Sequence, residues 1–268
     1  MIRAETEPRR PSDVNGKEYA ARVKWSRRLR HVLRTEVIDN ASSLELAEEV
    51  SRRNDGLVVV FTHFSRIDPV HTILVMVKQE EIGRKNFLVP IALHQDRHIF
   101  HKLGNETAIK LIPIVTENTL KRDGYKNRKP NEGGREYLNE AADSIRKGEV
   151  VFVSAQGERE PHLGQPEKPT MGLFMRKMKL SGIENYSILF VGFEIKGTED
   201  YSKKKGFNFL NRYTANIGAC LSSKTILERA TGMAREAEKI SEKPANPFKH
   251  VDRVIYEELN KVVPPEYR

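Results

Sequence analysis

Residues 57–69 read Leu57-Val58-Val59-Val60-Phe61-Thr62-His63-Phe64-Ser65-Arg66-Ile67-Asp68-Pro69, an apolar run followed by a histidine, an aspartate and a proline. The first five residues of this stretch are apolar without alternation, which predicts a short strand buried on both faces. Asp68-Pro69 predicts the start of a helix with proline in its first turn. The stretch therefore predicts a buried strand, a tight turn that carries a histidine, and a helix that runs to about residue 79.

The same alternation of apolar strands and amphipathic helices continues along the chain. Strands are predicted over residues 87–92, 111–115, 150–153, 188–193 and 213–219. Further helices are predicted over residues 16–38, 42–53 (opened by a capping box, Ser42 to Glu45), 94–110, 135–147, 170–180, 224–240 and 248–262. This order favours an α/β fold with a mixed, largely parallel sheet and helices on both faces.

The chain is expected to divide into a basic helical arm, residues 1–45, and a single α/β domain with two C-terminal helices, residues 46–268. The arm contains Trp25, the only tryptophan, among several arginines. Such a helix either lies on an anionic membrane or packs one face against its own domain.

Bulk composition limits the class of protein. The 268 residues include 46 Lys and Arg against 37 Asp and Glu, a net charge of +9 that favours anionic partners without choosing among nucleic acid, lipid headgroups and phosphorylated substrates. No run of 18 apolar residues is present, and residues 1–5 lack the apolar stretch of a secretory signal, so a cytoplasmic protein is expected. Cys220 stands alone, which argues against an internal disulfide and a cysteine zinc site.

His63 and Asp68 are the candidate catalytic residues. In the catalytic interpretation, His63 accepts a proton from an attacking hydroxyl, while Asp68 orients the ring and stabilises the cation that forms. In the structural interpretation, Asp68 caps a helix and His63 merely ends a strand. A carboxylate has enough lone pairs for both roles, so the two interpretations can coexist.

A second motif, Ser154-Ala155-Gln156-Gly157-Glu158-Arg159, follows the strand at 150–153. Gly157 allows a close approach of backbone to a ligand, and Arg159 can pair bidentately with a phosphate. The alternative is a surface arginine in a charged loop. In a largely parallel sheet both motifs are expected at the carboxyl ends of strands, where ligands bind.

Together the two motifs resemble the glycerolipid acyltransferase family, which includes the glycerol-3-phosphate and lysophosphatidate acyltransferases. The family pattern N-H-x-S-x-x-D is matched at His63, Ser65 and Asp68, and F-P-E-G-T-R is matched at Gly157 and Arg159. Residues 111–115, 168–172 and 188–193 look like the remaining family blocks, so that the resemblance covers about residues 55–200.

The resemblance implies that His63 is the general base and Asp68 its orienting partner. It implies substrate binding by Ser65, Gln156, Gly157 and Arg159. Two departures concern the acceptor: Gln156 replaces the family glutamate, and Thr116-Glu117 stands where an arginine usually follows the middle strand. Either Lys121, Arg122 or Arg128 supplies the missing phosphate contact, or the acceptor differs from the usual phosphoglycerol.

The implied activity is transfer of a fatty acyl group from a thioester, acyl-CoA or acyl carrier protein, to a hydroxyl of glycerol phosphate or a lysophospholipid. No cofactor and no nucleic acid are expected, and the enzyme would be peripheral on the anionic inner face of the membrane. The alternatives are a non-catalytic lipid- or anion-binding module on the same scaffold and, more weakly, a basic nucleic-acid-binding protein. His94, His98 and His101 recur near Asp96, but no carboxylate set completes a metal site, and none is expected.

Overall fold

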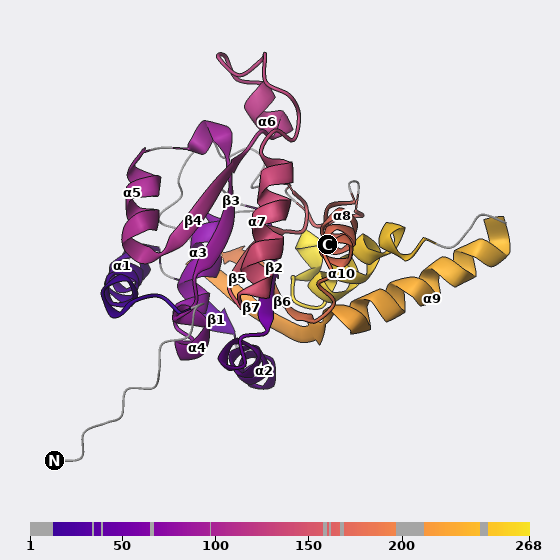
Figure 1. Cartoon of the computed structure of the whole chain (residues 1–268), viewed down its shortest axis with the longest axis horizontal. Coiled ribbons are helices and arrows are strands. Elements are labelled where there is room, and N and C mark those ends of the chain that lie inside the picture. Colours follow the sequence, from indigo (N-terminus) through magenta and orange to yellow (C-terminus); the bar gives the residue numbers. More distant parts are fainter. Residues whose placement is uncertain are drawn as a thin grey trace.

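The computed structural model describes residues 13–33, 35–38, 40–64, 67–96, 98–157, 160, 162–166, 169–196, 212–241 and 246–268. The centre of the described chain is a seven-stranded sheet in the order β1-β7-β6-β2-β5-β3-β4 (Figure 1). The strands are β1 (Thr35–Ile38), β2 (Gly56–Phe61), β3 (Phe87–Ala92), β4 (Ile109–Ile114), β5 (Val150–Ser154), β6 (Tyr186–Lys196) and β7 (Arg212–Ser222). Neighbouring strands are parallel except β6 and β7, which confirms the expected mixed, largely parallel sheet.

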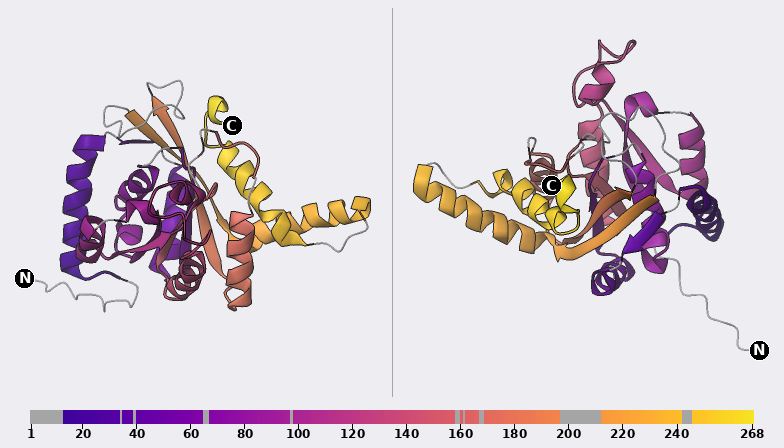
Figure 2. Two further views of the ribbon diagram at one scale, coloured as in Figure 1. Left: turned by 90° about the horizontal axis from the view of Figure 1, so that it is seen from above. Right: turned by 180° about the vertical axis from the view of Figure 1, so that it is seen from behind.

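Helices lie on both sides of the sheet, and α9 projects well beyond it (Figures 1 and 2). They are α1 (Gly16–Leu33), α2 (Ala41–Arg52), α3 (Asp68–Met76), α4 (Glu80–Gly83), α5 (His98–Thr107), α6 (Glu117–Leu120), α7 (Gly134–Arg146), α8 (Thr170–Leu180), α9 (Ser223–Ser241) and α10 (Val251–Asn260). Short 3₁₀ turns are η1 (Leu93–Gln95), η2 (Pro247–Lys249) and η3 (Pro265–Tyr267). Every residue of β2 and β5 is buried, as the unbroken apolar runs predict for central strands.

The helix predicted over residues 16–38 is wrong in its last part. It ends at Leu33, and residues 35–38 form β1 instead, paired in parallel with Tyr213–Asn216 of β7. Thr35 and Val37 are half-buried while Glu36 and Ile38 are exposed, the alternation of an edge strand. Pairing with a distant strand has therefore overridden the helical pattern of the preceding residues.

Three further boundaries differ from the prediction. Residues 94–110 do not form one helix: α5 ends at Thr107, Ala108 adopts a φ of 52°, and β4 begins at Ile109. The capping box predicted at Ser42 is wrong, because the Asn40 side chain caps α2 by accepting a hydrogen bond from the Ser43 amide at 3.4 Å. Helix α3 ends at Met76 rather than near residue 79.

Helix α1 is fastened to the α/β domain by Arg22, which is 2% exposed. Its guanidinium donates to the carbonyls of Gly83, Lys85, Thr107 and Ala108 at 2.5–2.9 Å and lies 4.1 Å from the centre of the Phe87 ring. Three of these carbonyls stand at the ends of α4 and α5, where the helix dipole is negative. Burial lowers the pKa of Arg22 to about 9, so the group stays cationic at neutral pH. The boundary predicted at residue 45 stays a prediction. Helix α1 contacts the domain through Arg22, and β1 is itself a strand of the sheet.

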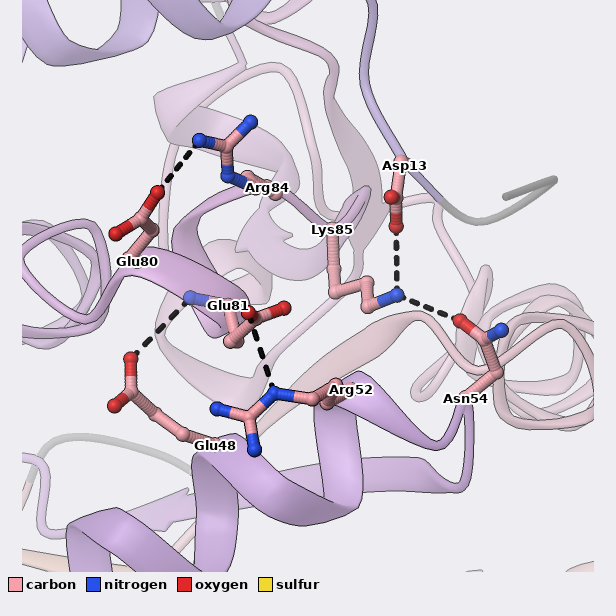
Figure 3. Close-up of polar contacts among 8 residues, drawn as sticks. All are labelled: Asp13, Glu48, Arg52, Asn54, Glu80, Glu81, Arg84 and Lys85. Atoms are coloured by element: carbon pink, nitrogen blue, oxygen red, sulfur yellow. Dashed lines mark hydrogen bonds and ion pairs between the residues drawn. The ribbon is translucent and has the colours of Figure 1, made fainter. Parts of the chain in front are cut away.

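A second buried cation, Lys85, ties the segment before α1 to the domain (Figure 3). Lys85 is 1% exposed, and its Nζ donates to Asp13 Oδ1 and to Asn54 Oδ1, each at 2.6 Å. The Arg52–Glu81 ion pair, 3.4 Å long, joins α2 to α4 in the same region. Across the described residues, no helix combines the length and the apolar character needed to cross a membrane.

Candidate active site

The turn after β2 carries the first candidate residue and is pinned to the neighbouring strand β6. The Thr62 amide donates to the Val191 carbonyl at 3.1 Å, and the Thr62 hydroxyl accepts from the Phe193 amide at 3.0 Å. Thr62 is fully buried. The main chain entering His63 is therefore fixed between the carboxyl end of β2 and the middle of β6.

The turn brings His63 and Asp68 together. His63 Nδ1 lies 3.7 Å from Asp68 Oδ2, the Asp68 side chain is fully buried, and the His63 side chain is 20% exposed. Among the described atoms, His63 Nδ1 has no hydrogen-bond partner. The separation exceeds a hydrogen bond, but catalytic contacts of this kind often tighten only when substrate is bound. In catalytic triads a buried carboxylate beside a partly exposed imidazole orients the ring.

Asp68 does not cap its helix in the way the structural interpretation assumed. The residue before α3 is Ile67, whose side chain makes no cap bond, and Asp68 occupies the first turn. Its Oδ2 accepts from the Phe64 amide at 2.6 Å, which holds the turn rather than the helix end. The negative charge still lies at the N-terminus of α3, where the helix dipole favours it.

Gln156 joins the two motifs. Its Oε1 accepts from the His63 amide at 2.6 Å, and its Nε2 donates to the His162 carbonyl at 3.1 Å. The His63 carbonyl accepts from the Glu160 amide at 3.0 Å. Gln156 is 8% exposed, so these contacts are largely shielded from water. The motif after β5 thus lies directly against the main chain of His63.

The remaining predicted substrate-binding residues fall into three groups. Gly157 is exposed, has a φ of 72° that favours glycine, and closes a tight turn by donating to the Ser154 carbonyl at 3.2 Å. Ser65 and Arg159 lie outside the described residues. Lys121 and Arg122 are exposed in the turn after α6, which extends away from the sheet in Figure 1. Within the described chain, neither of these two side chains bonds to His63.

Sequence reasoning missed Tyr267, which supports the turn from the C-terminal segment. Its ring stacks on Phe64 with centroids 5.2 Å apart, and its hydroxyl donates to the Ile195 carbonyl at 3.2 Å. Its own carbonyl accepts from the Leu163 amide at 2.6 Å. Tyr267 therefore contacts the turn of His63, the end of β6 and the loop after Gln156, although nothing in the sequence near His63 points to it.

Strands β5 and β3 are paired over only part of their length. Strand β3 pairs with β5 only at Phe87 and Leu88, the first two residues of β3, but pairs with β4 along its whole length. The carboxyl half of β3, residues 90–92, is only half-buried although it is apolar. A partly exposed apolar strand end thus flanks the strand that leads to Gln156.

Two of the three histidines near Asp96 contact polar side chains. His94 Nδ1 contacts the Thr119 hydroxyl at 2.9 Å, and His101 Nε2 contacts Asp96. Within the part of the chain that the structure describes, no three side chains of metal-binding type are grouped to hold an ion.

The chain matches no family model and no curated protein. Support for a function therefore comes from the two motifs and from the geometry of the His63–Asp68 pair.

Proposed function

We propose that this chain is an acyltransferase that moves a fatty acyl group from a thioester to a hydroxyl of glycerol phosphate or a lysophospholipid. The observation that carries the proposal is the His63–Asp68 pair, in which a partly exposed imidazole lies 3.7 Å from a fully buried carboxylate. Its position just beyond the carboxyl end of β2 is where α/β sheets place their chemistry.

The chemistry follows from which ring nitrogen faces which group. Because Nδ1 lies toward Asp68, Nε2 is left for the substrate. Nε2 takes the hydroxyl proton as the acceptor oxygen attacks the thioester carbonyl, and Asp68 stabilises the imidazolium. When the tetrahedral intermediate collapses, the carbon–sulfur bond breaks and the departing sulfur takes that proton. The products are an ester and a free thiol, CoA or acyl carrier protein, and His63 returns to its neutral state.

Three features support an acyl donor, an anionic acceptor and attachment to a membrane surface. The half-buried apolar residues 90–92 of β3 offer surface of the kind that a hydrocarbon chain contacts. The net charge of +9 favours phosphorylated acceptors and anionic lipid. On α1, Trp25 is 36% exposed and the Arg28 guanidinium lies 5.7 Å from its ring, which supports peripheral attachment to the anionic inner face of the membrane.

The test is thiol release and ester formation by the purified chain, with acyl-CoA or acyl carrier protein as donor and glycerol 3-phosphate or lysophosphatidate as acceptor. His63→Ala is expected to lower turnover by about 10²- to 10⁴-fold, the usual contribution of a general base. The matched control is His98→Ala, because His98 is an exposed histidine on α5. Unchanged turnover of a folded His63→Ala protein would refute the assignment.

A non-catalytic lipid- or anion-binding module is the second candidate. The observation that favours it is that Thr116 caps α6 at the place where the family has an arginine. Liposome binding without thiol release toward any acceptor would support this candidate. Salt-sensitive binding to DNA or RNA would instead favour the third alternative, a nucleic-acid-binding protein.

A further inference from the structure

We infer that Gln156 is a positioning residue that holds the main chain of His63, and that it does not bind the acceptor. The inference rests on the proposed acyl transfer and changes the role that the family resemblance gave to this side chain. It also gives a reason for glutamine at a position where the family carries glutamate.

Both polar groups of the His63 main chain are hydrogen-bonded, one to Gln156 of the second motif and one to Glu160 just after it. The His63 amide donates to Gln156 Oε1 at 2.6 Å, and the His63 carbonyl accepts from the Glu160 amide at 3.0 Å. Gln156 Nε2 donates in turn to the His162 carbonyl at 3.1 Å. One side chain thus spans two loops, and both ends of its amide are engaged.

The His63 amide and the His162 carbonyl can both be satisfied by a side-chain amide. A backbone N–H can only donate and a backbone carbonyl can only accept, so the side chain between them must accept at one end and donate at the other. Glutamine does both. An ionised glutamate would still accept from the His63 amide but would turn a second acceptor toward the His162 carbonyl. Glutamine therefore satisfies both backbone partners, whereas an ionised glutamate would satisfy only one of them.

The position of the His63 ring depends on this contact because the ring is attached to the main chain that Gln156 holds. Displacing a reacting group by about 1 Å can cost about 10²-fold in rate. Loss of a positioning contact lowers kcat, whereas loss of an acceptor contact that is equal in ground and transition states raises KM. The two roles therefore differ in which constant changes.

The experiment compares Gln156→Ala and Gln156→Glu with Ser154→Ala. Ser154 is the last residue of β5, two positions before Gln156. Its buried hydroxyl has no hydrogen-bond partner among the described residues. Two quantities are measured: kcat and KM for glycerol 3-phosphate, and amide hydrogen exchange at His63 followed by NMR. Exchange needs no turnover, so it reports on the contact even if the wild-type chain transfers no acyl group and the proposed function fails.

Gln156→Ala is expected to lower kcat about tenfold or more with KM little changed, and to speed exchange of the His63 amide about fivefold or more. Gln156→Glu keeps the acceptor, so the His63 amide stays protected and kcat falls less than in Gln156→Ala. Ser154→Ala should leave both quantities unchanged. If Gln156→Ala fails to fold, the nearly isosteric Gln156→Glu still tests the inference, because kcat must fall while the His63 amide stays protected.

Either of two results would overturn the inference. One is a rise in KM at constant kcat in a Gln156 variant, which would mark an acceptor contact. The other is unchanged exchange at His63 in Gln156→Ala, which would show that the amide is held by something else.

Discussion

Replacing Arg22 with methionine is expected to weaken the whole fold and not only the first helix. The change leaves four carbonyl oxygens without the charged donor that now lies 2.5–2.9 Å from them. A hydrogen bond to a charged group contributes about 1.5–3 kcal/mol, but such bonds are not additive, and the variant also avoids burying a charge. A buried carbonyl left without a donor costs about 1–3 kcal/mol, and we therefore expect a loss of about 3–5 kcal/mol for the variant. Against a total stability of about 5–15 kcal/mol, this loss would be large.

The assay is equilibrium urea unfolding followed by far-UV circular dichroism. Arg28→Met is the matched control, because Arg28 is exposed on the same helix, and its effect should stay within about 0.5 kcal/mol. Arg22→Lys keeps the charge but lacks the planar guanidinium that reaches several carbonyls at once. Its loss of unfolding free energy should therefore lie between those of the control and Arg22→Met. A single transition with an unchanged slope is expected for all three variants, because α1 and the sheet unfold together.

A loss below about 1 kcal/mol in Arg22→Met would refute this account of Arg22. So would two separate transitions of which only the first responds to the substitution. The second outcome would mean that residues 1–45 behave as an independent arm, as the sequence predicts.

Two further predictions concern buried aromatic groups near the candidate site. Burial lowers the pKa of His71 to about 3, so between about pH 6.5 and pH 3 the unfolded chain binds the extra proton and stability falls with falling pH, by up to about 1.4 kcal/mol per unit. His71→Leu should flatten this dependence of the urea midpoint on pH, and an unchanged slope would contradict the prediction. Tyr267→Ala removes the ring that stacks on Phe64 and should cost about 3–5 kcal/mol, whereas Tyr267→Phe loses one hydrogen bond worth about 1 kcal/mol. Equal losses in thermal unfolding of the two Tyr267 variants would show that the stack contributes little.

The central part of the fold could be predicted because its elements carry their own pattern. The bounds of β3 and α8 agree with prediction, and β2 and β5 are within one residue of it. Strand β1 could not be predicted with the same reasoning because its partner is β7, far along the chain. A signal was nevertheless present: β-branched residues alternate with a charged residue in Thr35-Glu36-Val37-Ile38.

The candidate site shows the same division between local and distant contacts. His63 and Asp68 are five positions apart, and the proline after Asp68 marked the turn that brings them together. The hydrogen bond from His63 to Gln156 depends on the parallel pairing of β2 with β5, which places the residues after both strands at one edge. Tyr267 had no comparable signal, because its contact with Phe64 depends on the path of the chain after α10.

The pairing of β1 with β7 has a consequence for synthesis of the chain. Residues 35–38 leave the ribosome long before Tyr213–Asn216, their partners, have been translated. Until then β6 is an edge strand of the nascent sheet, and its unpaired amides and carbonyls can pair with strands of other chains. A product terminated before β7 would keep that open edge permanently, and we would expect such fragments to aggregate or be degraded.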